Sequence, residues 1–205
     1  MKNARSIEDS REAKAVSGGH AAIAKEITLS DGRAVSFRPM TVGDRDRIIS
    51  FARSLPHNDL LFLRTDITQS SNVDDWMRHI NEGATVTVLA EIGQQLAGYA
   101  SVHTDQARWT RTIGEIRLQV GPRFRGLGLG RLLAAEIFSI GKERGLRKMA
   151  AMMTPDQAGA RAAFEKLGFQ IEALLQNWVV DRQGRPRDLI IMSQMLDSIG
   201  DRSAA

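Results

Sequence analysis

Residues 120–133 read Val-Gly-Pro-Arg-Phe-Arg-Gly-Leu-Gly-Leu-Gly-Arg-Leu-Leu. An alternating apolar run ends at Val120, glycines follow at positions 126, 128 and 130, and the apolar spacing predicts an amphipathic helix directly after them. Glycine lets the backbone turn tightly and bring its N–H groups close to a ligand. At a helix start these groups carry partial positive charge, which suits a phosphate or pyrophosphate. The stretch therefore predicts a diphosphate-binding turn, with three arginines adding positive charge: Arg123, Arg125 and Arg131.

The spacing of these glycines excludes two other phosphate-binding motifs. A dinucleotide-binding turn needs glycines at its first, third and sixth positions, but the sixth position counted from Gly126 is Arg131. A P-loop closes with Gly-Lys followed by Ser or Thr, and no such triplet occurs here. A glycine-rich connection that binds nothing is the remaining alternative. The flanking arginines and the strand–loop–helix context favour the binding turn.

The spacing Arg125-x-x-Gly128-x-Gly130 resembles the acyl-CoA signature of the GNAT family of N-acetyltransferases. In that family, Arg or Gln, two residues, Gly, one residue and then Gly or Ala precede a helix, and the loop amides hold the CoA pyrophosphate. The segment 157–169, Gln-Ala-Gly-Ala-Arg-Ala-Ala-Phe-Glu-Lys-Leu-Gly-Phe, is similar to the family's other CoA-contacting motif, Asn-x-x-Ala-x-x-x-Tyr-x-x-x-Gly-Phe. It departs from that motif at Gln157, which replaces Asn, and at Phe164, which replaces Tyr.

The resemblance implies a function and a set of cofactor contacts. It implies an acetyl-CoA-dependent N-acetyltransferase that transfers the acyl group to a primary amine by direct attack of the amine on the thioester. The cosubstrate is then acetyl-CoA, and no metal is expected. The residues implied in CoA binding are Leu118, Val120, Arg123, Arg125, Gly126, Leu127, Gly128, Leu129, Gly130, Arg131, Gln157 and Phe164.

Alternating side chains on two neighbouring strands predict where the chemistry occurs. In the strand before the glycine loop, Glu115, Arg117 and Gln119 share one face, and in the preceding strand Tyr99, Ser101 and His103 do the same. Polar faces on adjacent central strands are unusual in a covered sheet and predict a water-filled cleft.

An amine acceptor needs a base. An amine of pKa about 10.4 is uncharged in roughly one molecule in a thousand at neutral pH, so a general base matters. Glu115 lies five residues before Val120, where many family members carry their catalytic glutamate, and the resemblance implies this role for it. An ion pair of Glu115 with Arg117 is the alternative. His103 is the second candidate, because histidine titrates near neutral pH.

The leaving thiolate needs a proton that Phe164 cannot supply. Water is the first option, because a thiol of pKa about 8.5 already leaves reasonably well. Tyr99, the chain's only tyrosine, is the second. The third is a protein that binds acyl-CoA without turning it over, a sensor or regulator.

Two loops are expected on the acceptor side, residues 54–72 and 181–188. The first is either an acceptor-side wall or a buried helix connection. Asp59 and Asp66 would attract a cationic amine, whereas Arg182, Arg185 and Arg187 would repel one. A small amine, an amino acid and a protein lysine therefore all remain open as acceptors. The acyl chain preference and the oligomeric state, with a homodimer among the options, also remain open.

Composition limits the other classes of protein. The absence of cysteine excludes disulfides, thiolate metal sites and cysteine nucleophiles. No apolar run approaches the roughly 20 residues that cross a bilayer, and the first twenty residues lack a signal peptide's apolar core, so we expect a cytoplasmic protein without a membrane partner. The formal net charge is +4. Since no basic stripe interleaved with aromatics accompanies it, we assign the charge to an anionic cofactor and do not expect a nucleic-acid partner.

The chain predicts one domain of α/β (α+β) class with the GNAT fold, a mixed, mostly antiparallel sheet flanked by helices. Residues 1–24 are expected to form a mobile tail, 25–199 the acetyltransferase domain and 200–205 a short C-terminal end. The pattern predicts strands at 27–29, 34–39, 84–91, 96–103, 112–120, 147–153, 173–180 and 187–196. It predicts a helix that is capped by Thr41 or Asp44 and runs to about Leu55, and further helices at 72–80 and 129–145. Thr154 is expected to cap a further helix that begins at Pro155 and ends at Leu167.

Overall fold

The computed structural model describes residues 25–196, except residues 61, 62, 64, 106, 108 and 182 and the side chains of residues 57 and 58. The expected N-terminal tail, residues 197–199 and the C-terminal end lie outside the described residues.

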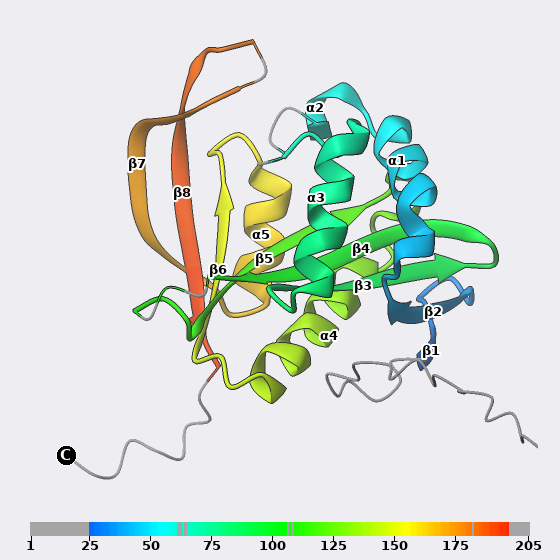
Figure 1. Ribbon diagram of the computed structural model, residues 1–205. Helices are drawn as coiled ribbons and strands as arrows, with labels where there is room; N and C mark the ends of the chain where they lie inside the picture. The colour runs from blue at the N-terminus through cyan, green and yellow to red at the C-terminus, as the bar shows by residue number, and fades with distance from the viewer. Residues whose placement is uncertain are drawn as a thin grey trace, which may run out of the picture.

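One mixed sheet of eight strands organises the described chain, in the order β1-β2-β3-β4-β5-β6-β8-β7 (Figure 1). The meander β3-β4-β5 and the two predicted hairpins, β1-β2 and β7-β8, are antiparallel, as expected. Within the described sheet, β5 and β6 form the single parallel pair. The strands are β1 (Lys25–Thr28), β2 (Ala34–Pro39), β3 (Thr85–Ile92), β4 (Gln95–Thr104), β5 (Ile113–Val120), β6 (Lys148–Met153), β7 (Gln170–Val180) and β8 (Pro186–Met195).

Helices cover both faces of this sheet and bury its two apolar clusters. α1 and α3 pack on one face over Leu89 and Tyr99, and α4 packs on the other with the apolar side predicted from its spacing (Figure 1). The helices are α1 (Arg45–Ser54), α2 (His57–Leu60), α3 (Ser70–Asn81), α4 (Leu129–Glu143) and α5 (Ala158–Lys166), and 3₁₀ turns precede α1 (Val42–Asp44) and α4 (Pro122–Phe124).

The predicted start of the fourth long helix is wrong. α5 begins at Ala158 with Gln157 as its N-cap, so Thr154 and Pro155 lie outside it. The Gln157 side chain folds back, and its Oε1 accepts hydrogen bonds from the Thr154 backbone N–H (3.0 Å) and from Thr154 Oγ1 (3.4 Å). The backbone N–H of Gln157 also donates to the Thr154 carbonyl at 3.0 Å. These bonds close a turn before the helix. The one-turn helix α2 was not predicted either.

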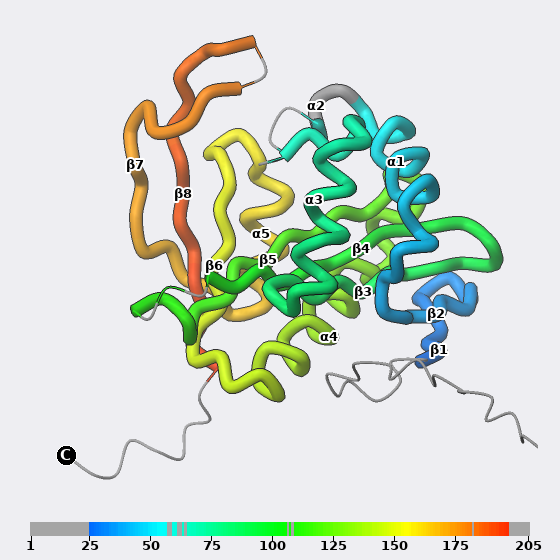
Figure 2. The backbone as a smooth tube through the Cα atoms, in the orientation of Figure 1, coloured from blue at the N-terminus to red at the C-terminus, as the bar shows by residue number. Residues whose placement is uncertain are grey.

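Strands β5 and β6 pair over three residues and then separate. Their register runs Ile113↔Lys148, Gly114↔Met149 and Glu115↔Ala150. Beyond that point β5 continues to Val120 paired with β4, and β6 continues to Met153 paired with β8. The backbone tube shows the two strands diverging at this point (Figure 2). Two strand edges therefore face each other without hydrogen bonds in the middle of the sheet.

Gly98 keeps β4 against β5 on the other side of this separation. A Cβ built there would lie 2.6 Å from the backbone oxygen of Gln119, which cannot move away as a flexible side chain could. We expect Gly98→Ala to lower the free energy of unfolding by about 1–3 kcal/mol, measured by urea denaturation. The matched control is Gly159→Ala in α5, where a Cβ meets nothing within 4 Å and alanine favours the helix. Equal effects of the two substitutions would contradict this account of β4–β5 packing.

Candidate functional site

A cavity of about 1090 Å³ occupies the space where β5 and β6 separate. Its floor comes from β4 and β5, one wall from the α2–α3 segment and α3, and the opposite wall from the β7–β8 hairpin. It reaches the other face of the sheet between the strands, because Leu118 of β5, Met153 of β6 and Phe164 of α5 all line it. The two loops expected on the acceptor side, residues 54–72 and 181–188, both contribute to its walls.

The predicted polar faces of β4 and β5 form the cavity floor. Six side chains stand there as three cross-strand pairs, and all of them line the cavity: Tyr99↔Gln119, Ser101↔Arg117 and His103↔Glu115. The floor is not uniformly wet, since Ser101 and Tyr99 are buried while the other four are partly exposed. The alternation on the two strands thus predicted the cleft, but it did not predict that Tyr99 and Ser101 are buried there.

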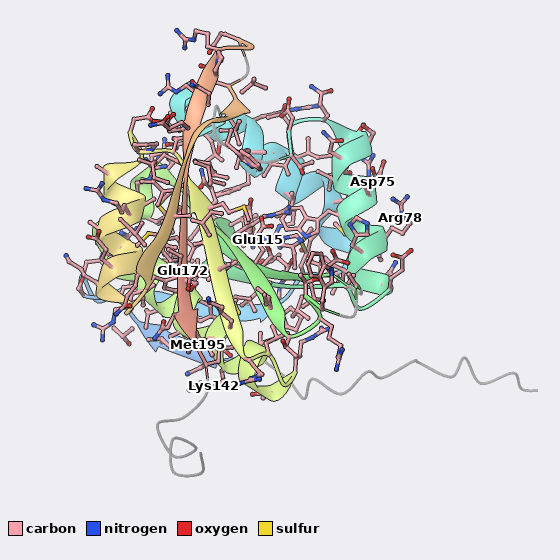
Figure 3. All side chains as sticks on the ribbon, turned by 90° about the vertical axis from the view of Figure 1, so that its left-hand side faces the viewer. Asp75, Arg78, Glu115, Lys142, Glu172 and Met195 are labelled. Carbon is pink, nitrogen blue, oxygen red and sulfur yellow. The ribbon has the colours of Figure 1, made fainter. Side chains whose placement is uncertain are left out.

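Glu115 and Arg117 form an ion pair on this floor. Arg117 Nε donates to Glu115 Oε1 at 2.9 Å, and the side chains are 30% and 18% exposed respectively. Figure 3 shows Glu115 on β5, inside the fold. The ion-pair alternative is therefore present in the structure, and it leaves the carboxylate on the cavity wall.

His103 is held by two hydroxyl groups. Its Nδ1 lies 3.0 Å from Thr85 Oγ1 and its Nε2 lies 2.8 Å from Ser101 Oγ. One ring nitrogen of a neutral histidine donates and the other accepts, so these contacts fix the ring plane. To accept a proton from a substrate, the ring would first have to exchange a hydroxyl partner. Both ring nitrogens of His103 are thus engaged within the protein.

Tyr99 is packed in an aromatic group beneath α1 and α3. Its ring centroid lies 5.0 Å from that of Trp76 and 6.1 Å from that of Phe51. Burial raises the pKa of Tyr99 to about 12, and the positive charge of Arg117 partly opposes this. The hydroxyl group therefore stays protonated at neutral pH. The ring also lines the cavity.

The glycine-rich turn has the open backbone that its sequence predicts. Gly126 and Gly128 adopt left-handed φ angles of +77° and +81°, which side-chain-bearing residues rarely adopt, and a Cβ at either would meet nothing within 4 Å. Gly128 is the N-cap of α4. The four backbone N–H groups of residues 128–131 find no acceptor within the described part of the chain. The turn is therefore an open cluster of donors, which suits a diphosphate group.

The arginines near this turn differ in what they contact. Arg123 and Arg131 are exposed, whereas Arg125 bonds to Asp59 of α2, which lines the cavity. Its Nε also donates to the Val120 carbonyl at 3.2 Å. The sequence predicted positive charge at the turn but could not predict that Arg125 already has a carboxylate partner.

The two departures from the second CoA motif are both visible in the structure. The amide of Gln157 is turned onto Thr154, as described above. The ring of Phe164 packs edge-to-face against Phe169 with centroids 4.9 Å apart and also lines the cavity. This position therefore presents an apolar ring to the cavity and no proton donor.

A bulge in β7 shapes the hairpin wall and was not predicted. The register shifts between Leu175 and Val179, and Asn177 adopts φ +51° while its N–H donates to Asp188 Oδ1 at 2.9 Å. Leu175 and Trp178, three residues apart, both line the cavity as a result. Asn tolerates this backbone region better than most residues, but that signal is weak. Leu61, Phe62, Arg64 and Arg182, expected beside the acceptor, lie outside the described residues.

Comparison with known proteins identifies the family. The model of the acetyltransferase (GNAT) family matches residues 47–169, more than half of the chain. The chain therefore belongs to the GNAT family of acetyltransferases. Within the described residues there is no group of three or more potential metal-ligating side chains, and no helix is long and apolar enough to cross a membrane.

Solved structures share the fold. The ribosomal-protein-alanine N-acetyltransferase of Brucella melitensis is 24% identical, with 78% of this chain and 98% of that chain covered and a TM-score of 0.69. Protein yncA of Salmonella typhimurium, solved with its cofactor acetyl-CoA, is 22% identical, with 83% and 99% covered and a TM-score of 0.70. The phosphinothricin acetyltransferase of Sinorhizobium meliloti, in complex with acetyl-CoA, is 21% identical, with 78% and 88% covered and a TM-score of 0.68.

The buried environment of Tyr99 predicts a delayed ionisation. Because it is the only tyrosine, the ultraviolet absorbance of tyrosinate reports on it alone. We expect a midpoint near pH 12 in the folded protein and about 10 in denaturant. Since the folded-state pKa is raised, the associated stability is present below about pH 10 and is lost as the pH rises toward 12. Tyr99→Phe should remove the signal, and a native midpoint near 10 would show that the ring is not buried as described.

Proposed function

We propose that this chain is an acetyl-CoA-dependent N-acetyltransferase that transfers an acetyl group to a primary amine. The observation that carries the proposal is a set of three neighbouring features: N–H groups of residues 128–131 that have no acceptor within the described residues, the edge of β5 beyond Glu115 that has left β6, and the polar floor of the cavity. Gly130 links the first two, because a Cβ built there would lie 3.7 Å from the side chains of Leu118 and Val120 of β5. Family membership supports the reaction class. The names of two neighbours, a ribosomal-protein-alanine N-acetyltransferase and a phosphinothricin acetyltransferase, support a nitrogen acceptor.

The cofactor would lie along these three features. Its diphosphate fits the donors at the start of α4, on the segment from Gly126 to Arg131, with Arg123 nearby. The rest of CoA would lie between Leu118 and Val120 of β5 on one side and Gln157 and Phe164 on the other. An extended amide-containing chain can bond to an open strand edge as an added strand would. When bound, acetyl-CoA supplies the activated acetyl group.

Direct transfer needs one bond made and one broken. The amine nitrogen attacks the thioester carbonyl carbon, the carbon–sulfur bond breaks, and its electron pair leaves with the sulfur. The amine proton goes to Glu115, directly or through a water molecule, with His103 as the second candidate. The leaving thiolate takes a proton from water, or from Tyr99, whose hydroxyl retains its proton well above neutral pH.

The proposed diphosphate site at the glycine-rich turn is tested by a substitution that places a side chain in it. A ligand at about a hundred times its dissociation constant stabilises the folded state by about 2.7 kcal/mol, which corresponds to roughly 5 °C or more in a domain of this size. We expect acetyl-CoA to raise the melting temperature of the wild type by about that much and to have no effect on Gly128→Glu. The control is Gly32→Glu in the β1–β2 turn, which has the same left-handed backbone strain at φ +85°. If the control lost the rise in melting temperature, or if Gly128→Glu kept it, the glycine-rich turn would not be the diphosphate site.

The proposed base is tested by removing its charge. Glu115→Gln keeps the shape of the side chain but cannot accept the amine proton, so the rate of CoA release with an accepted amine should fall at least about tenfold. Glu82→Gln, an exposed glutamate at the end of α3, is the matched control and should keep the wild-type rate. The thiol released as CoA gives the measurement. An unchanged rate in Glu115→Gln would reassign the base to His103 or water.

A non-catalytic acyl-CoA sensor is the second candidate function. It is favoured by the apolar ring of Phe164 where the family motif has a tyrosine, and by the turned-in amide of Gln157. Acetyl-CoA binding without release of CoA, across a broad panel of amines, would support the sensor. Turnover with any amine in that panel would exclude it.

A further inference from the structure

Arg117 stands at the centre of the cavity floor with most of its hydrogen-bonding capacity unused. Its Nε donates to Glu115, and neither of its Nη groups has an acceptor in the described part of the chain. Its cross-strand neighbour is Ser101, and the side chain is 30% exposed toward the cavity. Enclosed donors are normally satisfied by protein, water or ligand. The planar guanidinium group is suited to bind a carboxylate with two parallel hydrogen bonds.

The charged side chains of the described cavity wall are paired with one another or with nearby residues of opposite charge. Each carboxylate on the described cavity wall has an arginine, in the pairs Asp59–Arg125, Asp75–Arg78, Glu115–Arg117 and Asp181–Arg185. The other arginine of the described wall, Arg187, bonds to Asp156. The described wall therefore has no excess negative charge to attract a simple cationic amine. An acceptor with no net charge of its own suits such a balanced site.

Two further polar groups next to Arg117 also have no hydrogen-bond partner in the described part of the chain. The Gln119 amide and the Tyr99 hydroxyl line the cavity and form no hydrogen bond within the described residues. Tyr99 is close enough to Arg117 for the guanidinium charge to act on its pKa. Three neighbouring side chains thus present donors to one part of the cavity. An oxyanion held there would accept from several of them at once.

We propose that Arg117 binds the carboxylate of the acceptor, and that this acceptor is a free amino acid. The inference rests on the proposed acetyltransferase function and narrows its substrate. Glu115 and Arg117 are two residues apart on one strand face, so their charged groups are adjacent. The amine and carboxylate of an α-amino acid are equally close together. The amino acid can therefore place its amine beside Glu115 while its carboxylate meets the Nη groups of Arg117.

The experiment compares amino acids that differ only in the carboxylate. Binding to the CoA-loaded protein is measured by calorimetry for a panel of free amino acids and for their carboxamides, and acetylation of the same compounds is measured with acetyl-CoA. We expect the free acid to be preferred by at least about tenfold in both measurements. In Arg117→Met the preference should fall to within about threefold, while Arg117→Lys should keep part of it because the charge remains without the planar fork.

Two controls separate this role from a structural one. Arg45→Met removes an arginine of α1 that pairs with Asp46 and Asp74, none of which lines the cavity, and it should keep the preference of the wild type. Any effect of Arg117→Met on the fold or on Glu115 acts on acid and amide alike. It therefore changes both rates but not their ratio. The acetyl-CoA-induced rise in melting temperature confirms that each variant is folded.

The outcomes distinguish the two proposals. Acetylation of amines without preference for the free acid, or a preference that survives Arg117→Met, overturns the role of Arg117 and leaves the acetyltransferase intact. Binding of free amino acids that depends on Arg117, without acetylation of any of them, overturns the enzymatic function and keeps the carboxylate site. No binding and no acetylation of any free amino acid overturns the assignment of the acceptor.

Discussion

The early end of pairing between β5 and β6 is the constraint on which the site depends. Parallel neighbours normally continue their hydrogen bonds along the shared length, yet here the register stops at Glu115↔Ala150. The exposed strand edges are thereby placed inside the sheet instead of at its margin. An unpaired strand edge in that position can form hydrogen bonds with an extended molecule that carries amide groups. The helices that flank it hinder pairing with a strand of a second protein.

The elements around the gap between β5 and β6 keep the gap open, and they make its two ends chemically different. Close packing at Gly98 holds β4 against β5, so β5 stays in the sheet although one of its edges is bare. At one end of the gap the left-handed turn at Gly128 directs the first N–H groups of α4 outward. At the other end, β4 and β5 present their polar faces. One end thus suits an anionic group and the other suits acid–base chemistry.

Local patterns in the sequence predicted most of this architecture. The alternation around Glu115 and Tyr99 placed both residues on one cavity floor, and the glycine spacing predicted the open turn before α4. These features depend on residues close together in the chain, where backbone geometry dictates the outcome. The identity of the family could also be inferred from two motifs within residues 125–169, which the family comparison confirms.

The sequence did not predict the contacts of several side chains whose partners lie far away in the chain or differ from the expected ones. Arg125 was expected at the diphosphate but bonds to Asp59, sixty-six residues away in the chain. Thr154 was expected to cap a helix, but α5 starts later, with Gln157 as its N-cap, and the Gln157 side-chain oxygen accepts a hydrogen bond from the Thr154 N–H. The β7 bulge at Asn177 depends on register with β8 and leaves almost no local signal. Such choices are decided by packing in three dimensions, so the roles of these residues required the structure.

Backbone hydrogen exchange with and without acetyl-CoA tests the central claim most directly, because it reports on the amides themselves. The account predicts that the N–H groups of residues 128–131, and those N–H groups of β5 beyond Glu115 that point away from β4, exchange readily in the free protein and become protected when acetyl-CoA is added. Protection confined to the β7–β8 hairpin or the α2–α3 segment, with residues 128–131 unchanged, would contradict it.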